Sequence, residues 1–201
     1  MTTKSNVSLV ALATLGLVLP TSAFAHVGIG PTSGFAHGFM HPLSGVDHIL
    51  AMVAVGMFAA SLGGRALWAV PLTFMSMMVV GGALGVAAIP LPYVEFGIAL
   101  SVVALGAAVA AQRQWPVTLA MAFVGAFAIV HGHAHGSEMA NTMSATEYGL
   151  GFVLGTGLLH LVGIAMGLGI MMFGASRARQ VLRIGGVAIA AAGVELLATL
   201  S

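Results

Sequence analysis

Residues 37–57, HGFMHPLSGVDHILAMVAVGM, decide how this sequence is interpreted, because they place four ionisable side chains inside an otherwise apolar segment. These side chains are His37, His41, Asp47 and His48. An aspartate at the centre of a membrane helix costs about 2.5 to 3.5 kcal/mol on insertion scales, so ionisable residues in such segments usually mark a functional site. Imidazole and carboxylate groups together are typical metal ligands. We therefore predict a metal site here.

The overall composition indicates a membrane protein. Of the 201 residues, 59% are hydrophobic and 5% are charged, and the mean hydropathy is +1.08, whereas a soluble domain carries roughly 25% charged residues. The length suffices for about six spans of roughly 20 residues with short connections. A formal net charge of +1 without any basic run provides no surface for nucleic acid. We predict an all-α membrane protein, a compact bundle of about six transmembrane helices in contact with lipid.

The amino-acid usage limits which atoms could hold a metal. The chain contains no cysteine, so thiolates are excluded and any ion must be bound by nitrogen and oxygen. Such ligands suit nickel, cobalt, zinc or copper(II). The 13 methionines are dispersed along the chain, and we interpret them as flexible apolar filling rather than as thioether ligands.

The N-terminal segment is typical of a cleavable secretory signal peptide. Lys4 precedes an apolar run that is shorter than a membrane span, and residues 23–25 read Ala-Phe-Ala, a small-x-small cleavage site. We predict a signal peptide at residues 1–25 and a single six-span domain at residues 26–201; an uncleaved first helix is the alternative. Cleavage would place His26 at the new N-terminus, where its amine and imidazole could capture a metal in an accessory role.

The positions of the charged residues predict the topology. We place six spans, with boundaries accurate to about 2 to 4 residues, at 39–62, 66–88, 93–111, 116–135, 148–173 and 181–200. With the mature N-terminus outside, every connection that contains arginine lies inside, as the positive-inside rule requires; the arginines are Arg65, Arg113, Arg177, Arg179 and Arg183. The outward loops carry no basic residue. Their acidic residues are Glu95, Glu138 and Glu147. We therefore predict that both mature termini lie outside and that the acidic outer face attracts cations.

Small residues recur at four-residue spacing within the predicted spans. Residues 151–155 and 163–167 each begin and end with glycine, and residues 81–85 contain three glycines. This spacing lets helices approach closely in lipid. We use it to predict close helix packing only, and the oligomeric state, a homo-oligomer included, stays open.

The first group of ionisable residues is predicted to lie on one helix face. His37, His41 and His48 are separated by four and seven residues, which return a side chain to the same side of a regular helix. Asp47 lies one step around, where it could act as a ligand beside His48 or as an acceptor that fixes an imidazole tautomer. Pro42 is expected in a first helical turn, where its missing N–H costs little. The alternative is a set of hydrogen-bonded buried histidines.

A second group lies in the sequence VHGHAHGSE, residues 130–138. In a regular helix His131, His135 and Glu138 share a face, whereas His133 points the opposite way. The two intervening glycines could open the backbone and bring His133 to the same side. In the predicted topology both groups lie near the outer surface, and we expect them to converge on one pore entrance. A histidine-rich surface loop is the alternative.

Two further ionisable residues lie within predicted spans. His160 is in the middle of the fifth span, on a face shared with small residues. It is either a metal ligand further along the path or a partner in an interhelical hydrogen bond. Glu195 lies near the outer end of the sixth span, as an accessory candidate whose carboxylate could instead extend to the interface.

The paired motifs resemble those of the HupE/UreJ family of nickel and cobalt permeases. The resemblance rests on His41-x5-Asp47-His48, preceded by His37, and on HGHAHGSE at residues 131–138, and it covers essentially the whole mature chain. It implies uptake of Ni2+, or in some members Co2+, as a transported substrate across the bacterial inner membrane for hydrogenase or urease assembly. The positions that the resemblance carries over are His41, Asp47, His48, His131, His135 and Glu138. The family often has phenylalanine where this chain has Val130.

These expectations define a transport mechanism and its rivals. The chain has no G-x4-G-K-[ST] loop for a nucleotide, so we predict a secondary permease without enzymatic activity or a permanently bound cofactor. A divalent cation moving inward gains about 4.6 kcal/mol per 100 mV. Protons compete for imidazole nitrogens, whose unperturbed pKa is about 6.5, so uptake should decline on acidification. The alternatives are a membrane metalloenzyme and a bis-histidine haem protein.

Overall fold

All regular secondary structure in the described part of the chain is helical. The computed structural model describes residues 34–139 and 144–200, so the predicted signal peptide and His26 lie outside the described residues. The helices of this part are α2 (Gly34–Ser44), α3 (Val46–Leu62), α4 (Ala66–Val86), α5 (Val94–Ala111), α6 (Val117–Glu138), α7 (Ala145–Met171) and α8 (Ala175–Ala198). No strand occurs in these two ranges.

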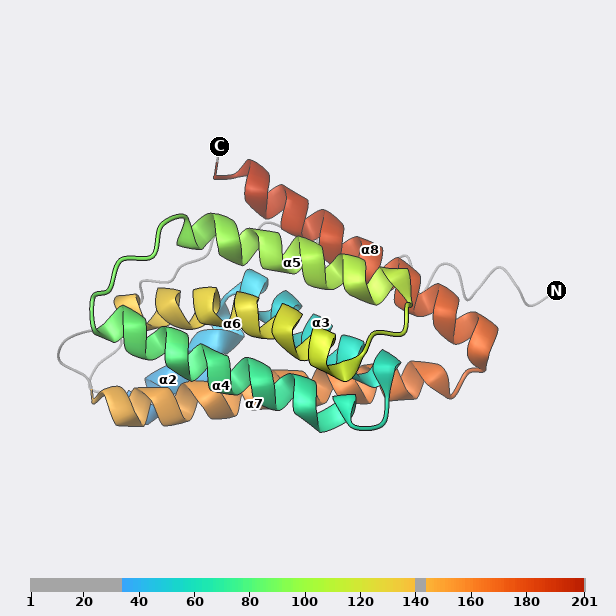
Figure 1. The fold of residues 1–201 in the computed structure, drawn as a ribbon, viewed down its shortest axis with the longest axis horizontal. Coiled ribbons are helices and arrows are strands. Elements are labelled where there is room, and N and C mark those ends of the chain that lie inside the picture. The colour runs from blue at the N-terminus through green and yellow to red at the C-terminus, as the bar shows by residue number, and fades with distance from the viewer. Residues whose placement is uncertain (1–33, 140–143, 201) are drawn as a thin grey trace.

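The helices from α4 to α8 are each long and apolar enough to cross a membrane. A sixth span results if α2 and α3 are counted together, so the prediction of an all-α bundle of about six spans is confirmed. Successive long helices run in opposite directions (Figure 1). The connections α3–α4, α5–α6 and α7–α8, near which the arginines lie, are therefore at one end of the bundle, and the connections α4–α5 and α6–α7 are at the other.

The first predicted span is not one continuous helix. α2 and α3 are separated by Gly45 and differ in direction by 80°. Gly45 has φ −93° and ψ 125°, an extended conformation, and the Ser44 hydroxyl donates a hydrogen bond to the His41 carbonyl at 2.7 Å. This bond satisfies one of the carbonyls that lose their partners where a helix ends. Ser-Gly is a recognisable turn signal that the hydrophobic pattern of the segment concealed.

Two expectations for this segment are wrong because of the break. His37, His41 and His48 do not share one face of one helix, since the break separates the first two from His48. Pro42 lies in the last turn of α2 rather than in a first turn. The convergence of these histidines, described below, therefore depends on the bend and not on helical periodicity.

Close helix contacts through glycine hold the bundle together. α4 packs most extensively on α6, α5 on α8, and α7 on both α2 and α3. A Cβ atom at Gly132 of α6 would collide with the Met78 carbonyl of α4, and one at Gly136 would collide with the Gly82 carbonyl. The glycines that could have opened α6 instead allow it to approach α4, and α6 continues as a helix to Glu138. The prediction of close packing through small residues is confirmed.

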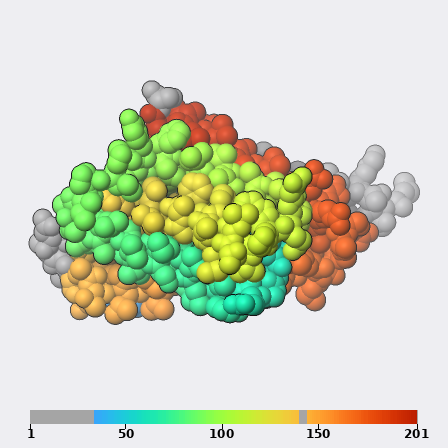
Figure 2. All heavy atoms as spheres, viewed as in Figure 1, coloured from blue at the N-terminus to red at the C-terminus, as the bar shows by residue number. Residues whose placement is uncertain are grey.

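The outer surfaces of the helices are apolar. Large side chains such as Trp68, Leu154, Leu161 and Val187 are each more than half exposed, as lipid-facing residues should be. In the space-filling view α4, α5 and α6 cover the face toward the viewer, and α2 is hidden behind them (Figure 2). Three of the histidines are nonetheless buried inside the bundle, with His48, His131 and His160 at most 2% exposed.

Candidate metal centre

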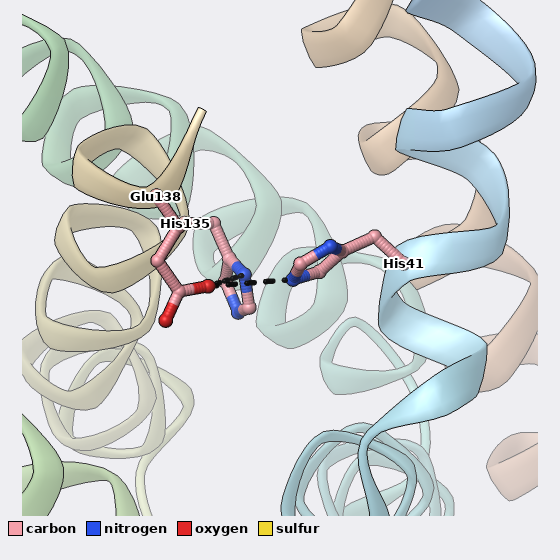
Figure 3. Close-up of side chains that lie close together, drawn as sticks. All are labelled: His41, His135 and Glu138. Atoms are coloured by element: carbon pink, nitrogen blue, oxygen red, sulfur yellow. Dashed lines mark ion pairs between the residues drawn. The ribbon is translucent and has the colours of Figure 1, made fainter. Parts of the chain in front are cut away.

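Three side chains from two helices form a group that could hold a metal ion. His41 of α2, His135 and Glu138 of α6 each offer one nitrogen or oxygen atom, and these atoms lie within 4.8 Å of one another (Figure 3). The Glu138 Oε2 atom is 3.6 Å from His41 Nε2 and 3.8 Å from His135 Nδ1. Ligands bonded at about 2.0 to 2.2 Å to one ion lie roughly 3 to 3.6 Å apart. Small side-chain movements would therefore bring all three onto one ion.

The positions of these side chains follow from two different local structures. His135 and Glu138 are three residues apart on α6, a spacing that places them on neighbouring turns of one face. His41 comes from α2, which lies close against α7 because Gly38 contacts the Tyr148 backbone and Gly151 contacts the Phe35 backbone. The Glu138 side chain is 54% exposed, whereas that of His135 is 11% exposed. The group is thus open to an approaching ion on the Glu138 side.

Two more imidazoles continue inward from this group. The Nε2 atoms of His48 and His135 are 2.9 Å apart, although these residues are separated by 87 positions in the sequence. The ring of His131 lies next to that of His48, with centroids 4.8 Å apart. His41, His135, His48 and His131 therefore form a continuous series of neighbouring rings.

The hydrogen bonding of His131 fixes which of its nitrogens is available. Its Nδ1 atom is 3.1 Å from the Phe127 carbonyl, and because a carbonyl only accepts, Nδ1 must carry the proton. The Nε2 atom then has a free lone pair, and it has no hydrogen-bond partner in the described part of the chain. A neutral imidazole with one nitrogen bonded to a backbone carbonyl and the other free is the usual state of a metal-binding histidine.

The structure does not bring every predicted ligand into this group. His133 points away, as expected for a regular helix, with Nε2 2.7 Å from the Ile89 carbonyl. The alternative, in which an opened backbone makes it a ligand beside His131 and His135, is wrong. His37 is exposed, with its ring centroid 6.2 Å from that of His41. It therefore lies beside the group, one turn before His41 on α2.

The remaining acidic candidates lie outside the three-residue group. Asp47 is half-buried in the first turn of α3, beside His48 in sequence. Glu195 is exposed on α8, which packs mainly on α5. The accessory candidate His26 is outside the described residues. His160 is buried deeper in the bundle and is treated separately below.

Two neighbours of the group, Phe152 and Glu95, were not named as candidate ligands from the sequence. The Phe152 ring contacts the rings of His41, His48 and His135, with the shortest centroid separation, 4.6 Å, to His135. Glu95 lies in the first turn of α5, at the end of the bundle where α6 ends with Glu138 (Figure 1). The sequence signal for Glu95 was its place among the acidic residues predicted to face outward; for Phe152 no sequence signal distinguished it from other apolar residues.

Comparison with known proteins gives consistent results. Residues 12–196 match the family described as HupE / UreJ protein. The chain is similar to a curated protein named "Protein HupE" from Rhizobium leguminosarum bv. viciae, with 45% identity over 182 residues, which cover 90% of this chain and 93% of the relative. No solved structure shows significant similarity to the chain.

Proposed function

The chain belongs to the HupE/UreJ family, and on this premise we propose that it is a secondary permease that imports Ni2+, with Co2+ as a second substrate, across the bacterial inner membrane. The observation that carries the proposal is the group formed by His41, His135 and Glu138, whose ligand atoms from two helices lie within 4.8 Å of one another. Nitrogen and oxygen ligands without thiolate suit these borderline divalent ions. The imported metal would serve hydrogenase or urease maturation.

The acidic residues at one end of the bundle support a first step of ion capture. Glu138 is exposed, and Glu95 lies at the same end of the bundle, in the first turn of α5 (Figure 1). Converging negative charges raise the local concentration of divalent cations. In the proposed orientation this end faces the periplasm, and a hydrated ion would exchange water for imidazole and carboxylate ligands there.

The series of buried imidazoles supports a second step of inward transfer. An ion held by His135 has His48 and then His131 as successive nitrogen ligands, because their rings are neighbours. Several moderate sites in a row allow an ion to bind and also to leave, which a single closed cage would prevent. The gain of about 4.6 kcal/mol per 100 mV for a divalent cation drives entry without ATP.

The ring geometry favours this function over a bis-histidine haem protein. The His48 and His135 rings are packed edge to face with centroids 4.2 Å apart. A porphyrin held between two axial imidazoles needs a flat space between the rings, and this pair leaves none. We therefore propose a metal-ion path and no haem.

Metal accumulation in cells that lack other nickel and cobalt importers tests the proposed function. We expect His41→Ala and His135→Ala to reduce accumulation of Ni2+ by about 100-fold or more, since even residues that only orient metal ligands cost 10- to 100-fold. His133→Ala is the matched control, because this histidine is also buried on α6 but points away from the group.

The outcomes of this experiment are distinct. Equal accumulation in the wild type and in His135→Ala would contradict the proposed function. Asp47→Asn, which keeps the shape of the side chain and removes its charge, separates transport from enzymatic chemistry. Loss of a hydrolytic activity with unchanged metal accumulation in this variant would favour a membrane metalloenzyme.

A further inference from the structure

His160 is a buried histidine that is not part of the group formed by His41, His135 and Glu138, which we call the outer group. It lies on α7 and is 1% exposed. Neither of its ring nitrogens has a hydrogen-bond partner among the residues that the structure describes. A buried polar group without a partner costs about 1 to 3 kcal/mol of stability. If His160 only filled space, an apolar side chain at this position would make the protein more stable. The interhelical hydrogen bond that could have explained His160 is not found in the described residues.

Two polar side chains and an aromatic ring near His160 come from adjacent turns of α7 and α4. On α7, Thr156 is one turn from His160 and is fully buried. On α4, Phe74 packs against the His160 ring with centroids 5.3 Å apart, and Met78 is one turn further along. The Thr156 hydroxyl lies 3.9 Å from the Met78 sulfur. A buried imidazole on α7 therefore lies one helical turn from a buried hydroxyl, and that hydroxyl contacts a thioether sulfur of α4.

This interface is connected to the outer group by neighbouring rings. The Phe74 ring also packs against His131, with centroids 5.8 Å apart, so a single aromatic side chain separates His131 from His160. Met78 lines a cavity of about 410 Å³ whose wall also contains His135. An ion at His131 is thus one aromatic side chain away from His160, and an ion at His135 borders the same cavity as Met78.

We propose that His160, with Met78 and Thr156, forms a second, inner binding station for the transported divalent ion, separated from the outer histidines by Phe74. The inference rests on the proposed function for its role in transport. Its ligand set is softer than that of the outer group because it replaces a carboxylate by a thioether. The station carries no acidic group among its three members, so it would hold a doubly charged ion less tightly and release it inward more readily.

This inference revises the interpretation of the methionines. From the sequence we interpreted all of them as flexible apolar packing residues. A methionine that binds a metal cannot be distinguished by sequence from one that only packs. Met78 differs from the others because the structure places its sulfur beside a buried hydroxyl and one helical turn from a ring that packs on His160. We therefore treat Met78 alone as a ligand.

Metal stoichiometry in the purified full-length protein tests the inner station. Protein in detergent is equilibrated with Co2+, whose visible absorption reports its ligands, and bound metal is counted by elemental analysis. We expect the wild type to bind two ions per chain and His160→Phe to bind one. His135→Ala, which damages only the outer group, should also bind one ion. Phenylalanine keeps an aromatic ring, somewhat larger than imidazole, and removes two unpartnered nitrogens. The cost of the added volume, about 1 to 3 kcal/mol, is offset by the similar gain from removing the unpartnered atoms, so His160→Phe should unfold near the wild-type temperature.

Isosteric substitutions make the test independent of any folding defect in His160→Phe. Met78→Leu removes the sulfur and Thr156→Val removes the hydroxyl. Each should change the Co2+ absorption and lower the affinity of the inner site for the ion about 10-fold, as does the loss of a residue that supports a metal site. Met57→Leu is the matched control, because Met57 is also buried but packs near Gly167, roughly 10 Å further along α7 than His160. It should leave both sites unchanged.

The results separate this inference from the proposed function. Two bound ions in His160→Phe, or unchanged Co2+ absorption in both Met78→Leu and Thr156→Val, would overturn the inner station. If His135→Ala abolishes uptake while His160→Phe transports at the wild-type rate, the permease function stands and the station is rejected. If the wild type binds two ions but accumulates no metal in cells, the station stands as a binding site and the permease function fails.

Discussion

The α2–α3 pair and α6 supply histidines to the same group by different structural routes. α6 is one continuous helix, and its helical spacing alone places His131, His135 and Glu138 along one side. α2 and α3 are separated by an 80° bend, and His41 and His48 reach the group from opposite sides of that bend. The comparison teaches that similar motifs in one chain can be assembled by periodicity in one case and by a break in periodicity in the other.

Glycine explains much of this difference. In α6, Gly132 and Gly136 stay helical because the backbone of α4 packs directly against them, and that contact offsets the cost of glycine in a helix, about 1 kcal/mol relative to alanine. At Gly45 the atoms nearest to an added Cβ would belong to the Asp47 and His48 side chains, not to the backbone of a neighbouring helix. Without a packed neighbouring backbone to hold it in a helix, Gly45 takes an extended conformation and the chain turns.

The largest effect is expected where α6 depends on contact with α4. Gly132→Val should lower the free energy of unfolding by about 3 kcal/mol or more, because its Cβ would occupy the position of the Met78 carbonyl. Thermal unfolding of the purified protein in detergent measures the change. A wild-type unfolding temperature would mean that α6 is helical by itself and does not need α4.

The matched control for this prediction is Gly149→Ala on α7. Among the described residues, no side chain and no other helix comes within 4 Å of a Cβ built at Gly149, so the substitution should stabilise the protein by up to about 1 kcal/mol through helix propensity. Destabilisation of both variants by similar amounts would show that any glycine substitution is harmful and that the α4 contact is not special.

An intermediate effect is expected from coupling between the two regions. If His41 and His135 bind one ion together, the losses of Ni2+ affinity in His41→Ala and His135→Ala should be non-additive by about 0.5 to 3 kcal/mol in the double variant. Isothermal titration of the purified proteins measures the three affinities. His41→Ala combined with His133→Ala is the control pair and should be additive within about 0.5 kcal/mol. Equal behaviour of the two pairs would place His41 and His135 on separate ions.

The smallest effect on stability is expected at the bend. The φ and ψ values of Gly45 are accessible to any residue, so Gly45→Ala should change the free energy of unfolding by no more than about 1 kcal/mol. The new Cβ would nevertheless lie 2.7 Å from Asp47 Oδ1, so the carboxylate would be pushed aside and the geometry of the bend disturbed, which should reduce Ni2+ affinity several-fold. Ser44→Ala removes only the hydroxyl bond to the His41 carbonyl and serves as the control. Wild-type affinity in Gly45→Ala would show that the bend is fixed by packing of α2 on α7 alone.

Most of the fold could be predicted from the sequence because membrane insertion is governed by local composition. Spans of roughly 20 apolar residues are required to cross the bilayer, and the helices α4 to α8 begin and end close to the predicted limits. The largest boundary difference is α8, which begins at Ala175 rather than at residue 181. The additional turns carry Arg177 and Arg179. Their charges lower the local hydropathy, so these turns were not recognised as part of the helix.

The sequence by itself determined the membrane class, the approximate number of spans and the residues with metal-binding chemistry, because these properties depend on composition and on spacing along one segment. Only the tertiary structure decided which imidazoles meet. It joined His48 to His135 across 87 positions, directed His133 to the Ile89 carbonyl, and placed Thr156 of α7 against Met78 of α4. The physical reason is that these contacts depend on the bend at Gly45 and on the close approach of helix backbones at glycines, and neither can be read from the periodicity of a single helix.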